Sequence, residues 1–145
     1  MSETVIPHSR PLIEADDIEA VKSVLESGMI AGGEQVSRFE GELASYIGLK
    51  HAAAVSSGTA ALFTILSALG VRNGDTVITS SYVCSALIHA IRMCGAEPVP
   101  ADSGDDLFHC DADTVTRVLR PSTKAILFPH MFGAACDIGN IIALG

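Results

Sequence analysis

The sequence predicts an α/β fold in which helices cover both faces of a mostly parallel sheet. From residue 51 onward, short apolar runs alternate with longer amphipathic segments. Glycine, proline or an Asn-Gly pair separates most of these segments from the next. Such alternation is typical of βαβ units, because parallel strands need a crossover connection that is usually a helix. The order of the segments therefore predicts a three-layer α/β/α arrangement.

Two helical patterns precede this alternation. The first places apolar residues at helical spacing after an acidic stretch, at Ile18, Val21, Val24 and Leu25. The second has the same kind of spacing and ends at Gly48, with Val36, Phe39, Leu43, Tyr46 and Ile47. Each pattern puts its apolar side chains on one face of a helix. We expect residues 1–50 to be an N-terminal helical segment, and residues 51–145 to be the first part of the α/β domain within one structural unit.

The α/β part can be predicted element by element. We expect strands at 52–55, 76–79, 97–101 and 124–128, because each is a short apolar run. We expect helices at 59–69, 83–94 and 112–119, which end at Gly70, at Gly95 and before Pro121. A turn is expected at Asn73-Gly74-Asp75. A last helix begins after Asp137 and has Ile141, Ile142 and Leu144 on its buried side, so we expect the sequence to be truncated at Gly145.

Composition argues against several classes of function. The net charge is -8 and the nine Lys and Arg residues are scattered, whereas a nucleic-acid surface needs them clustered. No apolar stretch approaches the roughly 20 residues that cross a bilayer, and the N-terminus lacks a signal-type core, so we expect a cytoplasmic protein without membrane contact. The cysteines have no C-x-x-C spacing, which favours free thiols over a metal site or disulfides: Cys84, Cys94, Cys110 and Cys136.

The most informative motif is Ser56-Ser57-Gly58-Thr59-Ala60-Ala61-Leu62, at the start of the helix expected over 59–69. The first backbone N–H groups of a helix have no intrahelical acceptor, and the helix dipole favours an anion there. Gly58 lets the main chain approach a ligand closely, while Ser57 and Thr59 add hydroxyl donors. The residues alone leave two interpretations open, namely a phosphate site and an ordinary helix start that Thr59 merely caps.

The complete set of motifs resembles the N-terminal portion of the DegT/DnrJ/EryC1/StrS sugar aminotransferases, which use pyridoxal phosphate and have fold type I. The resemblance extends over essentially the whole chain. Besides the motif at 56–62, its landmarks are Ser9-Arg10-Pro11, Ser27-Gly28, Gly32-Gly33, Phe39-Glu40, Tyr46-Ile47-Gly48, Gly74-Asp75-Thr76-Val77-Ile78, Gly95-Ala96-Glu97-Pro98-Val99, Thr123-Lys124-Ala125-Ile126, His130, Gly133 and Asp137. The resemblance implies a homodimer that moves an amino group from glutamate to a nucleotide-linked keto sugar.

The resemblance also implies the contacts of the cofactor. Ser57, Gly58 and Thr59 correspond to the turn that receives the cofactor phosphate. Family members place an aromatic ring over the cofactor just after the strand at 76–79, but here an ungapped alignment puts Cys84 at that position and Tyr82 two residues earlier. Either side chain is a candidate for this contact, and both also suit a core position. Met29 and Ile30, with Gly28, fall where family members line the substrate entrance.

No catalytic residue is expected in this chain. The family needs a lysine that condenses with the cofactor aldehyde, and none of Lys22, Lys50 and Lys124 is at the family position. That lysine and the carboxylate on the pyridine nitrogen are implied downstream of Gly145. We expect His130 to order a loop and Asp137 to cap a helix. Two alternatives stay open, namely a sugar dehydratase of the same family and a non-catalytic cofactor-binding or dimerisation module.

Overall fold

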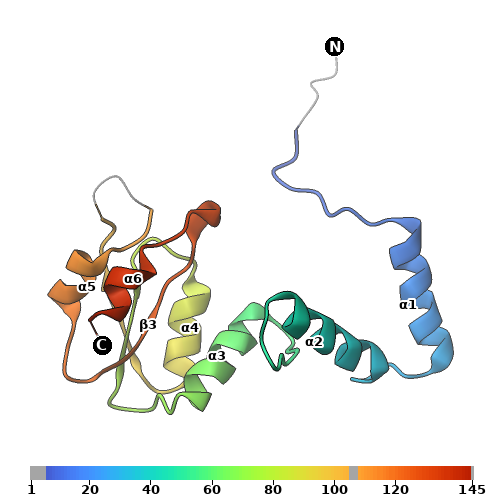
Figure 1. Cartoon of the computed structure of the whole chain (residues 1–145), viewed down its shortest axis with the longest axis horizontal. Coiled ribbons are helices and arrows are strands. Elements are labelled where there is room, and N and C mark those ends of the chain that lie inside the picture. Colours follow the sequence, from blue (N-terminus) through green and yellow to red (C-terminus); the bar gives the residue numbers. More distant parts are fainter. Residues whose placement is uncertain (1–5, 105–107, 145) are drawn as a thin grey trace. The chain divides into compact units, whose positions relative to one another are not determined.

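A computed structural model of the chain describes residues 6–104 and 108–144 (Figure 1). The chain divides into two compact units, Met1–Ala54 and Val55–Gly145. Each unit is described by itself below.

The described part of unit 1, from residue 6 onward, contains two helices, α1 (Ala15–Ser27) and α2 (Glu34–Tyr46), as the apolar spacing predicts. A capping box starts α1, in which the Glu14 N–H donates to the Asp17 carboxylate at 2.9 Å. Gly28 ends the helix with φ 73°, a left-handed conformation that glycine adopts without steric cost. Both helices that the apolar spacing predicts are therefore present in the structure.

The apolar faces of these two helices are not covered within unit 1. Among its described residues only Ala44 is buried. The exposed apolar side chains include Ile18, Val21, Leu25, Phe39, Tyr46 and Ile47. Short helices gain most of their stability from burying such a face, so unit 1 carries surface suited to contact with further protein.

Unit 2 is a three-stranded parallel sheet with helices on both faces. Its strands are β1 (Thr76–Ser80), β2 (Glu97–Ala101) and β3 (Thr123–Leu127), in the order β2-β1-β3. Its helices are α3 (Gly58–Ala68), α4 (Ser85–Met93), α5 (Ala112–Val118) and α6 (Ile138–Ile142), with a short 3-10 turn at Met131–Gly133. All five residues of β1 are buried.

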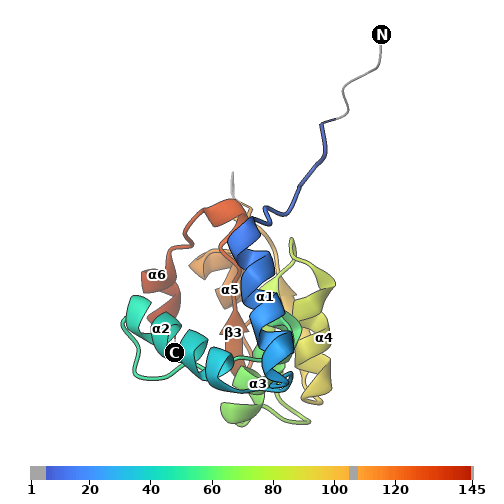
Figure 2. The ribbon, with the colours of Figure 1, turned by 90° about the vertical axis from the view of Figure 1, so that its right-hand side faces the viewer.

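Alternate side chains of β1 point into two separate cores. Val77 packs with Leu66 of α3 and with Ala90 and Ile91 of α4. Its neighbour Ile78 packs on the other face with Val99, Cys110 and Val115, where α5 lies. Figure 2 shows β3 between α4 on one side and α6 on the other. The predicted three-layer α/β/α arrangement is confirmed.

The predicted strand at 52–55 is wrong. In the structure this apolar segment is not in a ladder, and its one backbone hydrogen bond to a side chain joins the Ala54 N–H to Glu40 Oε1 at 2.7 Å. A strand exists only where a neighbour supplies ladder hydrogen bonds, and the described strands β1, β2 and β3 pair only with one another. The run of alanines is thus compatible with a strand but has no partner among the described residues.

Other boundaries differ from the prediction by one or two residues. The helix predicted over 83–94 begins at Ser85, because Cys84 has an extended backbone with φ -67° and ψ 150°. The last strand begins at Thr123 and ends before Phe128. Among the described residues, no helix is long and apolar enough to cross a membrane.

Leu66 of α3 is completely buried in the core that it shares with α4 and β1, so its truncation should leave a cavity there. We expect Leu66→Ala to lower the free energy of unfolding by about 3 kcal/mol. The matched control is Leu69→Ala at the exposed C-cap of the same helix, which should cost under about 1 kcal/mol. Urea denaturation followed by circular dichroism measures both. An equal loss of unfolding free energy in the two variants would contradict the burial of Leu66 in this core.

The Cys110 thiol should make the stability of unit 2 sensitive to alkaline pH. Burial raises the pKa of Cys110 to about 11, whereas the thiol of an unfolded cysteine has a pKa of about 8.5. Since folding favours the protonated thiol, its contribution is complete below the unfolded pKa and is lost as pH rises toward the folded pKa. We expect the free energy of unfolding to fall between about pH 8.5 and 11. Cys110→Ala should reduce this slope in urea denaturation series, and an unchanged slope would refute the assignment.

Candidate functional site

The start of α3 has two backbone donors that the helix does not use. Ser57 is the N-cap, with an extended backbone at φ -166° and ψ 165°. Its hydroxyl accepts from the Ala60 N–H at 3.1 Å, and its carbonyl accepts from the Ala61 N–H at 2.9 Å. The N–H groups of Gly58 and Thr59 have no acceptor among the described residues. These two groups remain available to an anion.

In the motif at 56–62, Ser57 and not Thr59 caps the helix. Because Ser57 is the cap, Thr59 is a residue of the helix itself, and its hydroxyl makes no hydrogen bond among the described residues. The Ser57 hydroxyl accepts the capping bond and keeps its own proton for donation. A Cβ added to Gly58 would meet nothing within 4 Å, so space is open beside the backbone. The motif thus combines N–H and hydroxyl donors around open space, which fits a phosphate group.

The loop after β1 holds the two candidates for contact with the cofactor ring. Cys84 is the N-cap residue of α4 and its thiol is exposed. Tyr82 is half exposed, and its ring lies 6.2 Å from the ring of Phe108, centroid to centroid. The structure therefore brings Tyr82 together with a residue from the loop after β2 that sequence reasoning did not single out.

Phe132 joins these two rings from the loop after β3. Its ring is edge-on to Phe108 with centroids 5.3 Å apart. Its backbone is left-handed at φ 55°, which costs a non-glycine residue about 1 kcal/mol or more. The neighbouring glycine, Gly133 at φ 81°, was the one sequence signal of an unusual turn here. Tyr82, Phe108 and Phe132 are defined here as the aromatic cluster.

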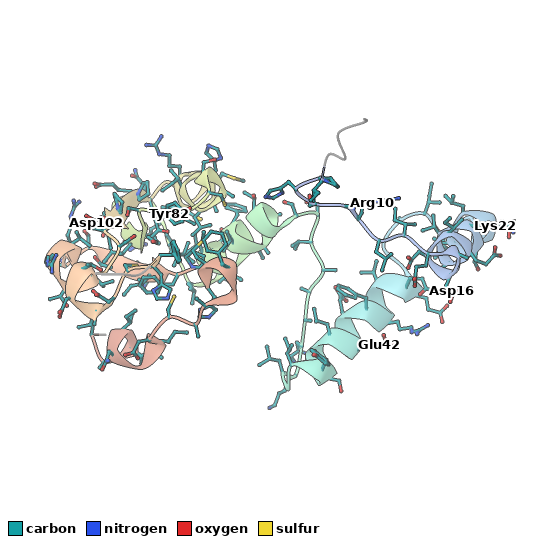
Figure 3. All side chains as sticks on the ribbon, turned by 90° about the horizontal axis from the view of Figure 1, so that it is seen from above. Arg10, Asp16, Lys22, Glu42, Tyr82 and Asp102 are labelled. Carbon is teal, nitrogen blue, oxygen red and sulfur yellow. The ribbon has the colours of Figure 1, made fainter. Side chains whose placement is uncertain are left out.

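Polar groups border the aromatic cluster. Asp102 follows β2 directly, and its Oδ1 atom accepts from the Ser103 N–H at 2.9 Å and from the Ser81 hydroxyl at 3.4 Å. Figure 3 labels Asp102 and Tyr82 in the same part of unit 2. Ser81, Tyr82, Ser103 and Phe108 line a hollow of about 480 Å³. This hollow lies where the chain leaves the carboxyl ends of β1 and β2, the edge at which α/β sheets bind ligands.

His130 and Asp137 have the structural contacts that the sequence predicts for them. His130 Nδ1 accepts from the Cys136 N–H at 3.1 Å, which closes the loop after β3. Asp137 Oδ1 accepts from the Asn140 N–H at 3.5 Å, so it caps α6. Neither contact requires a catalytic role.

Met29 and Ile30 lie in unit 1, on the loop between α1 and α2. Both are largely exposed. With Ser23, Ser27 and Gln35 they line a hollow of about 600 Å³. A small apolar surface is thus available beside α1, formed by residues of unit 1 alone.

The three lysines of the chain lie at separate exposed positions. Lys22 projects from α1 (Figure 3), with its Nζ atom 3.3 Å from Glu19 and 3.9 Å from Glu26. Lys124 is exposed near the beginning of β3, at the amino end of the sheet. Lys50 is exposed beyond the end of α2. In the described parts of the chain, no three His, Cys, Asp or Glu side chains gather in a way that could hold a metal ion.

Comparison with known proteins gives both sequence relatives and structural neighbours. The chain is 41% identical over 139 residues to the spore coat polysaccharide biosynthesis protein SpsC of Bacillus subtilis, and the match covers 96% of this chain and 36% of SpsC. The PLP form of Spr1654 of Streptococcus pneumoniae, a protein assigned as a sugar aminotransferase, matches with a TM-score of 0.92 at 32% identity, over 96% of this chain and 36% of that one.

A second solved structure, NtdA of Bacillus subtilis with bound PMP, matches with a TM-score of 0.84 at 32% identity, over 91% of this chain and 31% of NtdA. The chain thus spans about a third of the length of these relatives. PLP and PMP are the cofactor forms in these solved neighbours. The sequence profile of the DegT/DnrJ/EryC1/StrS aminotransferase family matches residues 11–145. The chain belongs to the DegT/DnrJ/EryC1/StrS aminotransferase family.

Proposed function

We propose that this chain supplies the phosphate-binding part of a pyridoxal-phosphate-dependent aminotransferase that acts on nucleotide-linked keto sugars, with glutamate as the amino donor. The observation that carries the proposal is the pair of uncommitted N–H groups at Gly58 and Thr59. Family membership supports the assignment of these N–H groups to the cofactor phosphate, because solved relatives contain PLP or PMP.

Four groups of this chain would hold the phosphate. The N–H groups of Gly58 and Thr59 belong to the first turn of α3, and Ser57 and Thr59 add a hydroxyl each from the same turn. The N-terminus of a helix carries about half a positive charge, so the dipole adds to these bonds. Hydrogen bonds to a charged group contribute about 1.5–3 kcal/mol each. The site thus binds an anion with neutral donors, in a chain whose net charge is -8.

Cys84 is the stronger candidate for contact with the cofactor ring. Its thiol is exposed, whereas the Tyr82 ring already faces Phe108. Sulfur is polarisable and makes favourable contacts with aromatic rings. When bound, pyridoxal phosphate supplies an electron-withdrawing ring that stabilises negative charge on the carbon next to the transferred nitrogen. The role of this chain would be to orient that ring by holding the phosphate of the cofactor.

The proposal assigns no lysine of this chain to the covalent chemistry. Lys22 is paired with Glu19 and Glu26, and Lys124 lies at the amino end of β3. A second candidate function follows from the same observation, namely a module that binds the cofactor without catalysis. Both functions share the phosphate site and differ in whether a lysine reaches the cofactor.

We further infer a homodimer in the cytoplasm. The exposed apolar faces of α1 and α2 support association, since such faces favour burial against protein. The free state of all four cysteines is typical of a reducing compartment. The loop at Met29 and Ile30 is proposed as part of the substrate entrance, as its exposed apolar surface allows.

Thr59→Val tests the phosphate site, because valine keeps the shape of threonine and removes only the hydroxyl donor. We expect the affinity of the chain for pyridoxal phosphate to fall about tenfold or more, the loss of one hydrogen bond to a charged group. Absorbance titration of the free-aldehyde band measures the affinity. The matched control is Thr64→Val on the same helix, whose hydroxyl bonds only to the Ala60 carbonyl. Equal affinities of Thr59→Val and the unmodified chain would contradict the site.

The lysine assignment has a separate test. After incubation with pyridoxal phosphate and reduction with borohydride, we expect no cofactor to remain attached at stoichiometric level after denaturation. Mass spectrometry of the digested protein reports modification at Lys22, Lys50 and Lys124. Stoichiometric modification of one of them that disappears in Thr59→Val would show that this chain does supply the lysine.

A further inference from the structure

We propose that Glu40 is a positioning residue for the phosphate-binding motif, because its carboxylate fixes the backbone that leads into the first turn of α3. The inference rests on the proposed function and extends it, since it assigns a residue of α2 to the support of the cofactor phosphate. Glu40 acts through the backbone at Ala54 and not by contact with the cofactor. Both residues belong to unit 1, and the effect reaches unit 2 along the chain.

The hydrogen bond between Glu40 and Ala54 is short and involves a charged acceptor. The Ala54 N–H donates to Glu40 Oε1 at 2.7 Å. Hydrogen bonds to an ionised carboxylate are about twice as strong as those between neutral groups. Glu40 is the one carboxylate of α2 that is partly buried, since Glu34 and Glu42 are exposed. Its side chain is therefore committed to the backbone of residue 54, fourteen positions along the sequence.

The segment at 51–56 has no other hydrogen bond to hold it. It is in no β-ladder among the described residues. Apart from Ala54, none of its backbone N–H groups has an acceptor in the part of the chain that the structure describes. A segment without hydrogen bonds samples many backbone conformations, and each residue that becomes fixed loses entropy. Glu40 therefore supplies the anchor that a neighbouring strand would otherwise provide.

The anchored backbone continues directly into the phosphate motif. Only residues 55–56 separate Ala54 from Ser57, whose extended backbone and hydroxyl cap α3. The uncommitted N–H groups of Gly58 and Thr59 follow at once. If Ala54 were released, residues 55–56 could fold over the start of the helix and fill the space beside these donors. With Ala54 held, less conformational freedom is lost when a phosphate binds, so the bond favours binding.

Glu42, on the same helix, provides a matched contrast to Glu40. Its carboxylate pairs with Arg38 of α2, with 2.6 Å between Oε1 and Nε, and Figure 3 labels it on this helix. The two glutamates have the same charge and length, but only Glu40 bonds to the segment at 51–56. Removal of a negative charge by itself favours an anion. A fall in phosphate affinity on loss of Glu40 therefore has the opposite sign to the electrostatic effect.

Backbone NMR relaxation of the isotope-labelled full chain tests the positioning role without any ligand. We expect amide order parameters of residues 54–56 near about 0.85 in the unmodified chain and in Glu42→Ala, and below about 0.6 in Glu40→Ala. Glu40→Gln should restore the order, because the side-chain amide oxygen still accepts a hydrogen bond. Order parameters in Glu40→Ala equal to those in Glu42→Ala would overturn the proposal.

The affinity for pyridoxal phosphate tests the consequence for the site. Absorbance titration should show binding about tenfold weaker in Glu40→Ala, as expected if roughly one more residue must become ordered. Glu40→Gln and Glu42→Ala should stay within about threefold of the unmodified chain. Both alanine variants should keep the helical circular dichroism of the unmodified chain. A loss of helical signal in Glu40→Ala alone would show that Glu40 supports α2 itself and would refute the positioning role.

The two readouts distinguish failure of this inference from failure of the proposed function. If pyridoxal phosphate binds in a manner that depends on Thr59, and Glu40→Ala binds it as tightly as the unmodified chain, the positioning role is wrong and the proposed function stands. If the unmodified chain binds no pyridoxal phosphate, the proposed function fails. The order parameters then decide the role of Glu40 alone: loss of order at residues 54–56 in Glu40→Ala supports it, and unchanged order refutes it.

Discussion

The parallel pairing of β1 with β2 on one side and with β3 on the other is the interaction on which the rest of unit 2 depends. It buries every residue of β1 and sends alternate side chains, Val77 and Ile78, into two cores. Because all three strands run the same way, their following loops leave from one edge of the sheet. Tyr82, Asp102 and the loop with Phe132 lie together for this reason, although long stretches of sequence separate them.

The motif at the start of α3 both caps the helix and leaves donors free for an anion. Ser57 satisfies the helix by capping the Ala60 N–H, and this leaves Gly58 and Thr59 uncommitted. An anion would bind there without disturbing the cap, because the helix hydrogen bonds do not depend on those two groups. The division of roles is therefore what makes the motif suitable for a phosphate. It also means that loss of the Thr59 hydroxyl should weaken binding without unfolding the helix.

Much of this fold follows from local sequence, and the exceptions have physical causes. Periodic apolar residues predict α1 and α2, and the Asn73-Gly74 turn and Gly95 mark the ends of elements that the structure also has. The run at 52–55 is apolar enough for a strand, but a ladder needs a partner and none is found among the described residues. The contact of Tyr82 with Phe108 was also beyond local reasoning, since it depends on loops from two strands. Phe132 was missed because its positive φ is fixed by neighbouring hydrogen bonds rather than by its own residue type.

The central claim is that the first turn of α3 binds a phosphate through its backbone. The most direct measurement is the NMR chemical shift of the backbone amide groups of the isotope-labelled chain during titration with pyridoxal phosphate. We expect the amide protons of Gly58 and Thr59 to move downfield and saturate, as hydrogen bonding to a charged oxygen requires, while those of Ala60 and Ala61 stay engaged with Ser57. Saturable binding that leaves Gly58 and Thr59 unchanged would contradict this account.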